Sequence, residues 1–219
     1  SPAAITASCE ASLRNLGLDY LDVYQLHGIG AGEITDELLH ALQQLRQRGL
    51  VRSVGINTHT AATLAWMVAH PDTFDVVLLD YNVLQQDREP LIDALHAAGI
   101  GVLAGTVLAQ GHLLPPRLRL PRLADGWYLA RAWLKPSSRQ LMRSARRMRH
   151  AVAAVTSQAP AQTAFAYVLQ HPGIASTVLG STRVAGLEQV LRTDPTALTP
   201  TERSRLVAAF GDGHGSPSH

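Results

Sequence analysis

Residues 35–57 have the sequence TDELLHALQQLRQRGLVRSVGIN, which predicts a helix followed directly by a buried strand. Thr35 and Asp36 are helix-starting residues, and the leucines at positions 38, 39, 42 and 45 repeat at helical spacing. Gly49 then ends the helix, and the short apolar run at 51–56 is typical of a strand. This stretch therefore indicates one step of a helix–strand alternation.

The same alternation extends in both directions along the chain. We expect helices at about residues 3–16, 34–48, 60–70, 88–98, 138–157, 160–170, 184–192 and 200–210. We expect strands at about residues 21–27, 51–56, 75–81, 100–106 and 174–179. Several of these strands are apolar on both faces, as parallel strands covered on both sides are. The pattern predicts an α/β fold, and both a doubly wound sheet and a βα barrel fit it.

Composition narrows the class of protein. The chain has 219 residues, 46% of them apolar and 16% charged, which is typical of a globular protein. Its single cysteine, Cys9, excludes an internal disulfide and a cysteine-built zinc site, and it fits a reducing, cytoplasmic location. We expect no metal site, because no metal-ligand spacing occurs, and no membrane contact, because no run of about 18 apolar residues occurs.

Positive charge is concentrated in one segment. Residues 117–149 carry ten basic residues and one acidic residue, a net charge of +9 in a chain whose net charge is +2. Nucleic-acid binding is one interpretation. We favour a solvated helix face or a basic rim beside a phosphorylated ligand, because no aromatic residues interleave with the arginines between 139 and 149. Four prolines at 107–137 predict a long loop or lid there.

Three places offer side chains for chemistry. His27 ends the first expected strand, where it could donate a hydrogen bond to a carbonyl, although a capped histidine at a strand end has the same pattern. Asn57 ends the second strand, where its carboxamide could pair with an amide ligand or form a turn. Residues 180–183, Gly-Ser-Thr-Arg, open a helix and could either bind phosphate or act as a simple cap.

Four stretches together resemble the aldo-keto reductase superfamily. They are residues 12–27, 45–57, 164–173 and 178–183, which occur in the family's order and spacing. The resemblance covers residues about 3–193 and implies a (β/α)8 barrel of the TIM type. Of that barrel the chain would carry strands four to eight as one partial domain, residues 1–210, followed by a disordered tail at 211–219.

The resemblance also implies a function. It suggests an NADP(H)-dependent oxidoreductase that reduces a carbonyl or oxidises an alcohol. By position, His27 matches the active-site histidine that orients the substrate carbonyl, and Asn57 matches the residue that holds the nicotinamide carboxamide. The family's 2′-phosphate loop and an acidic position near the adenine correspond to Gly180, Ser181, Thr182, Arg183 and Glu188.

The chain departs from the family pattern in several places. Ile56 stands where the family has Ser, Leu78 where it has Gln, Gly105 where it usually has Tyr, and Val190 where it has Asn. The family's catalytic Tyr, Asp and Lys lie before the segment with which this sequence begins, and nothing in this sequence replaces them.

These departures support a second hypothesis. The chain would be a truncated, catalytically impaired barrel remnant that acts as a binding or assembly module. Its open face would be covered by a second copy of the chain or by a missing N-terminal segment. A third hypothesis is an anion or nucleic-acid binder that uses residues 117–149.

Overall fold

The computed structural model describes residues 2–108, 150–156, 158–180 and 184–211, without the side chains of the last two. The chain forms two compact units. Unit 1 consists of Ser1–Asp80, Arg88–Gly105 and Pro172–Thr177, and unit 2 of Tyr81–Asp87, Thr106–His171 and Val178–His219.

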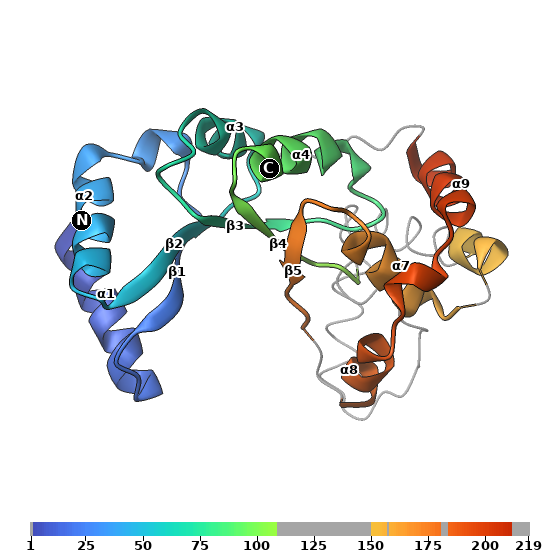
Figure 1. The fold of residues 1–219 in the computed structure, drawn as a ribbon, viewed down its shortest axis with the longest axis horizontal. Helices are drawn as coiled ribbons and strands as arrows, with labels where there is room; N and C mark the ends of the chain where they lie inside the picture. The colour runs from blue at the N-terminus through green and yellow to red at the C-terminus, as the bar shows by residue number, and fades with distance from the viewer. Residues whose placement is uncertain (1, 109–149, 157, 181–183, 212–219) are drawn as a thin grey trace, which may run out of the picture. The chain divides into compact units, whose positions relative to one another are not determined.

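Unit 1 contains a five-stranded sheet in the order β1-β2-β3-β4-β5, in which all the pairs are parallel (Figure 1). The strands are β1 (Leu21–His27), β2 (Val51–Asn57), β3 (Val76–Asp80), β4 (Gly101–Gly105) and β5 (Ile174–Thr177). Each lies within two residues of a predicted strand, so the α/β fold with a parallel sheet is confirmed.

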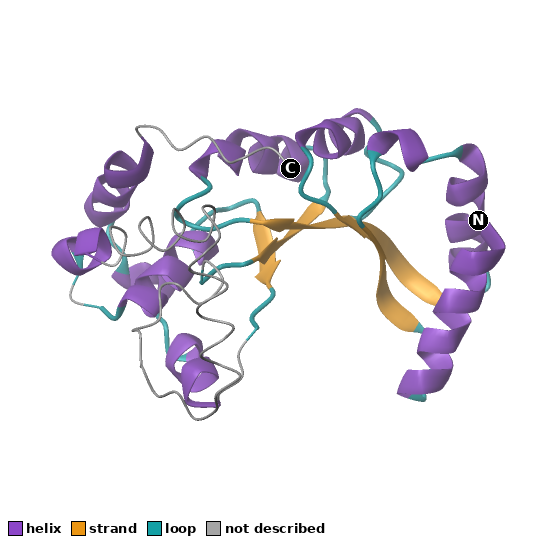
Figure 2. Cartoon of the chain, turned by 180° about the vertical axis from the view of Figure 1, so that it is seen from behind, coloured by secondary structure: helices purple, strands orange, loops and turns teal. Residues whose placement is uncertain are grey.

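The connecting helices of unit 1 start and stop where the sequence indicates. They are α1 (Pro2–Leu16), α2 (Asp36–Gln47), α3 (Ala61–Ala69) and α4 (Glu89–Ala97), with a short 3-10 turn η1 (Ala31–Glu33), and they follow one side of the sheet (Figure 2). Thr35 caps α2, because its hydroxyl accepts the Leu38 N–H at 3.3 Å. Gly49 and Gly99 follow α2 and α4 in the left-handed conformation, with φ of +70° and +77°.

The two faces of the sheet differ. One register row consists of buried apolar residues: Leu26, Ile56, Val77 and Val102. This row faces the helices, and on the same face the Tyr24 hydroxyl donates to the Ile5 carbonyl of α1 at 3.4 Å. The next row faces the other way and consists of exposed or half-buried residues: His27, Asn57, Leu78 and Leu103. The open face therefore carries the polar strand ends.

The described part of unit 2 consists of helices and the loops between them. Its helices include α7 (Pro160–Leu169), α8 (Val184–Leu191) and α9 (Pro200–Gly211), with a 3-10 turn η4 (Pro195–Ala197). Gln170 joins α7 to η4, because its Nε2 donates at 2.6 Å to the carbonyls of Pro195 and Leu198. Arg203 of α9 lies over the Tyr167 ring at 4.0 Å and donates to the Tyr167 carbonyl.

Several predictions fall wholly or partly outside the described residues. The lid predicted at 107–137 is described only at residues 107 and 108, and the basic segment 117–149 is not described. The helix predicted at 138–157 is described, and helical, from His150 to Val155. Gly211 belongs to α9, whereas the rest of the predicted tail is not described. In the described ranges, no helix is long and apolar enough to cross a membrane.

Candidate active site at the carboxyl ends of the strands

His27 and Asn57 lie side by side at the carboxyl edge of the sheet. They are register partners at the ends of β1 and β2, and Asn57 Nδ2 lies 3.1 Å from His27 Nδ1. Because an amide N–H can only donate, His27 Nδ1 accepts this bond, and the proton of the neutral ring is on Nε2. The His27 side chain is exposed, so its Nε2–H can donate to a ligand.

Two side-chain atoms, one in this pair and one on β1, lack a hydrogen-bond partner among the described residues. Asn57 Oδ1 is buried and accepts no bond, and Gln25 Nε2 is buried and donates none. Gln25 precedes His27 by two positions in β1, so both side chains belong to the same face of the sheet. A buried polar group without a partner costs free energy, which a ligand with complementary donors and acceptors recovers.

The next two strands end in Asp80 and Gly105, which are also register partners. Asp80 is on the same face as Asn57, because Asn57 pairs with Leu78 and side chains alternate along β3. A Cβ added to Gly105 would lie 3.4 Å from Asp80 Oδ1, an ordinary contact, so packing near the backbone does not require glycine here. The strand ends therefore place an imidazole, a carboxamide and a carboxylate along one edge of the sheet.

His59, a loop residue between β2 and α3, is not among the residues for which the sequence suggested a chemical role. In the structure His59 follows Asn57 by two residues, and its Nδ1 lies 3.3 Å from Asp80 Oδ2. The only signal in the sequence was its closeness to the end of a predicted strand, which many loop residues share.

The structure describes only part of the loop that we predict to bind the 2′-phosphate. Gly180 is exposed, and Glu188 lies on the exposed surface of α8, both in unit 2. Ser181, Thr182 and Arg183 lie outside the described residues. The structure therefore brings together His27 and Asn57, and the roles of Gly180, Ser181, Thr182, Arg183 and Glu188 stay predictions.

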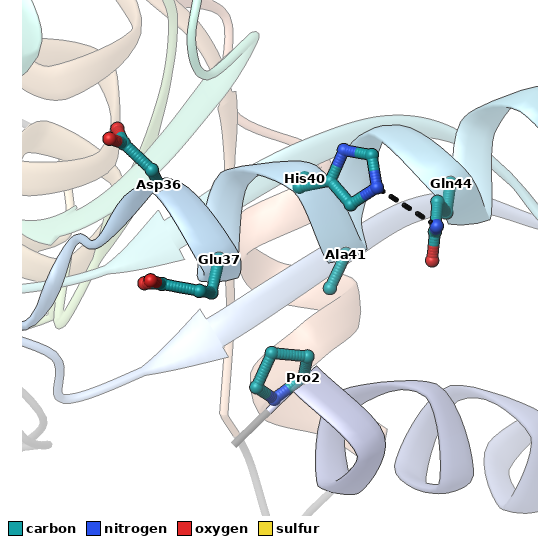
Figure 3. A pocket seen from close by; sticks show the side chains of 6 residues that line it. All are labelled: Pro2, Asp36, Glu37, His40, Ala41 and Gln44. Carbon is teal, nitrogen blue, oxygen red and sulfur yellow. Dashed lines mark hydrogen bonds between the residues drawn. The ribbon is translucent and has the colours of Figure 1, made fainter.

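A hollow of about 420 Å³ lies away from the strand ends, against α1 and α2 (Figure 3). Its lining consists of Pro2, Asp36, Glu37, His40, Ala41 and Gln44. His40 Nε2 contacts Gln44 Nε2 at 3.0 Å, one turn further along α2. None of these residues is a predicted site residue, so this hollow is not the candidate site.

Cys9 is poorly suited to act as a nucleophile. Cys9 is buried in α1, and burial raises the pKa of its thiol, which disfavours the nucleophilic thiolate. No group of three or more His, Cys, Asp or Glu side chains is placed to hold a metal ion within the described ranges.

Sequence comparisons identify similar proteins. A family model described as "Aldo/keto reductase family" matches residues 1–209. The L-glyceraldehyde 3-phosphate reductases of Escherichia coli K12 and O157:H7 are both 27% identical to this chain over 198 residues. That match covers 84% of this chain and 56% of each reductase, so the chain spans little more than half the length of these curated relatives.

Solved structures show the same fold. The holo form of an aldo-keto reductase from Bacillus halodurans matches with a TM-score of 0.76 at 22% identity, covering 95% of this chain and 67% of that one. Its apo form matches with a TM-score of 0.73 at 23% identity, covering 95% and 69%. At such identities the likeness shows the fold alone, and it confirms the predicted barrel type, of which the described strands are a part.

Proposed function

The chain belongs to the aldo/keto reductase family, and from this premise we propose that it is an NADP(H)-dependent oxidoreductase acting on a small-molecule carbonyl or alcohol. The observation that carries the proposal is the bond between His27 and Asn57 at the strand ends, which leaves His27 Nε2–H and Asn57 Oδ1 for ligands. The first is a donor suited to a carbonyl oxygen. The second is an acceptor suited to the N–H of a nicotinamide carboxamide.

Each residue has a separate task in this proposal. The nicotinamide, when bound, supplies or accepts the hydride. His27 donates its Nε2–H to the substrate oxygen, which orients the carbonyl and favours the negative charge that develops on that oxygen. Asn57 fixes both partners, because its Nδ2 holds the His27 ring while its Oδ1 accepts from the carboxamide.

The 2′-phosphate of NADP(H) would be bound by residues 180–183. A glycine followed by two hydroxyl side chains and an arginine, directly before α8, is a suitable donor set for a phosphate group. Glu188, one turn into α8, would accept from the adenosine part of the cofactor.

An Arg183→Ala variant tests this assignment. We expect the affinity for NADPH, measured by fluorescence titration, to fall by about tenfold or more while the affinity for NADH is unchanged, because only NADPH carries the phosphate that Arg183 would bind. Arg192→Ala removes an exposed arginine just after α8 and serves as the matched control.

The titration is paired with measurements of NADPH-dependent turnover on a panel of aldehydes. The panel includes glyceraldehyde 3-phosphate, because the curated relatives are named as reductases of that compound. A wild-type chain that binds neither cofactor would contradict the proposed function. Equal losses for NADPH and NADH in Arg183→Ala would contradict the role of Arg183 alone.

One observation favours the second candidate function, an assembly module that dimerises. β1 is the edge strand of the described sheet, and large exposed apolar side chains lie on it or lead into it: Leu16, Leu18, Tyr20 and Val23. An edge strand with an exposed apolar approach is a typical pairing surface. We take a second copy of the chain as its occupant, with the two β1 strands related by a two-fold axis.

Light scattering tests this candidate. We expect a dimer for the wild-type chain, and at least a tenfold weaker dimer for Val23→Lys, because a charge on β1 opposes strand pairing. Val207→Lys, which changes an exposed valine of α9 in unit 2, is the control. A monomeric wild-type chain with cofactor-linked turnover would rule this candidate out.

A further inference from the structure

Thr106, which directly follows β4, has a backbone conformation that is unusual for its residue type. Its φ is +49°, and in the described ranges no other residue except glycine has a positive φ. This left-handed region is strained for a β-branched residue, whereas glycine adopts it freely. Gly105 stands immediately before Thr106 but is not one of the glycines with a positive φ. The chain therefore has a strained threonine where a glycine would carry no strain.

The side chain of Asn82 holds this strained backbone from the turn that follows β3. Its Nδ2 donates to the Thr106 carbonyl at 3.2 Å and lies 3.5 Å from the Thr106 hydroxyl. Both residues belong to unit 2. Asn82 is only 4% exposed, so water competes little for its amide, and a buried amide that lost this partner would be left unsatisfied.

The amide of Asn82 is itself fixed by the turn that contains it. Its Nδ2 also donates to Gln85 Oε1 at 2.8 Å, and its Oδ1 accepts the Leu84 N–H at 3.0 Å. The Gln85 N–H donates to the Asn82 carbonyl at 2.8 Å, which closes the turn. The bonds of the amide to Thr106, Gln85 and Leu84 form what we call the Asn82 clamp. Both amide hydrogens and the amide oxygen are engaged, so the side chain cannot rotate without losing bonds.

The conformation of Thr106 also decides where the chain goes after β4. The next residue, Val107, is 1% exposed, so the chain passes at once from the strand end to a buried position. Strained backbone persists only where its surroundings over-determine it, and it concentrates at functional sites. In barrels of the TIM type, the loops that follow the carboxyl ends of the strands bind the ligand. The Asn82 clamp therefore fixes the start of a loop of this kind.

We propose that Asn82 is a positioning residue that holds Thr106 in the left-handed conformation and so preorganises the loop after β4 for the cofactor, an inference that rests on the proposed oxidoreductase function. Without the Nδ2 donor, Thr106 relaxes toward a negative φ, and only a fraction of the molecules keeps the competent loop. The apparent affinity for the ligand then falls in proportion to that fraction. Asn82 acts through the backbone of Thr106 and needs no contact with the ligand.

NMR and urea unfolding test the Asn82 clamp without any ligand. The backbone chemical shifts of Thr106 should report a positive φ in the wild-type chain and lose it in Asn82→Asp. That variant keeps an acceptor for the Leu84 N–H and replaces only the Nδ2 donor. The folding equilibrium constant of Thr106→Gly should exceed that of Thr106→Ala by about threefold or more, because alanine keeps the strain and glycine removes it.

Fluorescence titration with NADPH tests the positioning role. We expect Asn82→Asp to bind NADPH about tenfold more weakly than the wild-type chain. Adding Thr106→Gly to Asn82→Asp should bring the affinity back to within about threefold of Thr106→Gly alone, because glycine adopts a positive φ as readily as a negative one. The double variant keeps the new carboxylate, so this recovery excludes a charge effect. Asn15→Asp, on the exposed surface of α1, should bind NADPH as the wild-type chain does.

The possible results separate the Asn82 clamp from the proposed function. A positive φ at Thr106 that persists in Asn82→Asp overturns the clamp, as does equal stability of Thr106→Gly and Thr106→Ala. Loss of the positive φ with unchanged NADPH affinity, or no recovery in the double variant, overturns the positioning role. A wild-type chain that does not bind NADPH contradicts the proposed function and the positioning role with it, and the NMR and unfolding results still decide whether the clamp holds Thr106.

Discussion

Replacing Gly55 with alanine is expected to lower the free energy of unfolding by about 3 kcal/mol or more, the upper range for overpacking a core. Gly55 lies in β2 opposite Val76 of β3. A Cβ at this position would lie 2.5 Å from Val76 Cγ1 and would also overlap the Val76 carbonyl oxygen. That oxygen belongs to the backbone of the neighbouring strand, so the sheet itself would have to separate.

Urea denaturation followed by circular dichroism measures the effect, and Gly101→Ala is the matched control. Gly101 lies in the same register row, opposite Val76 on the β4 side. The nearest atom to its added Cβ, the Asp75 carbonyl oxygen, is 3.6 Å away. We expect Gly101→Ala to change stability by less than about 1 kcal/mol, since alanine also restricts the unfolded chain. Equal stability of the two variants would contradict the close approach of β2 and β3.

The order of strands and helices could be predicted because each element has its own local signal. Leucines at helical spacing, the cap at Thr35 and the stop at Gly49 all lie inside one stretch of sequence. The sequence also predicted that His27 and Asn57 each end a strand, and the structure makes these strands parallel neighbours, so the two residues share an edge.

The pair of His59 and Asp80 could not be predicted in this way. Their contact depends on the register of β2 against β3, which sets Leu78 opposite Asn57 and so places Asp80 beyond the end of β2. Register is fixed by packing between strands, and no local pattern in the sequence reports it. The local sequence of a histidine two residues after a strand is the same whether its side chain contacts a carboxylate or solvent.

The fold shows what the departures from the family pattern change at the strand ends. Ile56 is fully buried in the row that faces the helices, so it cannot replace a polar ligand at the open face. Leu78 adjoins Asn57 on the open face and offers no hydrogen bond there. Gly105 provides no side chain at the end of β4. In the proposed function, Asn57 would therefore make the contact with the nicotinamide carboxamide without a polar side chain at position 56, 78 or 105 to assist it.

Asn57→Asp is expected to reduce kcat by about 100-fold or more while cofactor affinity changes little, because it inverts the tautomer of His27. The variant keeps the shape of the side chain and an oxygen acceptor for the carboxamide. It replaces the Nδ2 donor with an oxygen, so His27 Nδ1 must carry the proton to keep the bond between the two side chains. When the ring is neutral, His27 Nε2 then presents a lone pair to the substrate oxygen instead of an N–H.

Asn15→Asp is the control, since it makes the same change of charge on the exposed surface of α1. Nitrogen-15 NMR should show the His27 proton on Nε2 in the wild-type chain and on Nδ1 in Asn57→Asp. An Asn57→Asp variant with the tautomer inverted but kcat intact would mean that the substrate oxygen does not depend on the His27 N–H. Loss of cofactor affinity without loss of kcat would instead make Asn57 a cofactor ligand only. Comparing the change in kcat with the change in cofactor affinity thus separates the two tasks that Asn57 would perform, which are holding the His27 ring and binding the carboxamide.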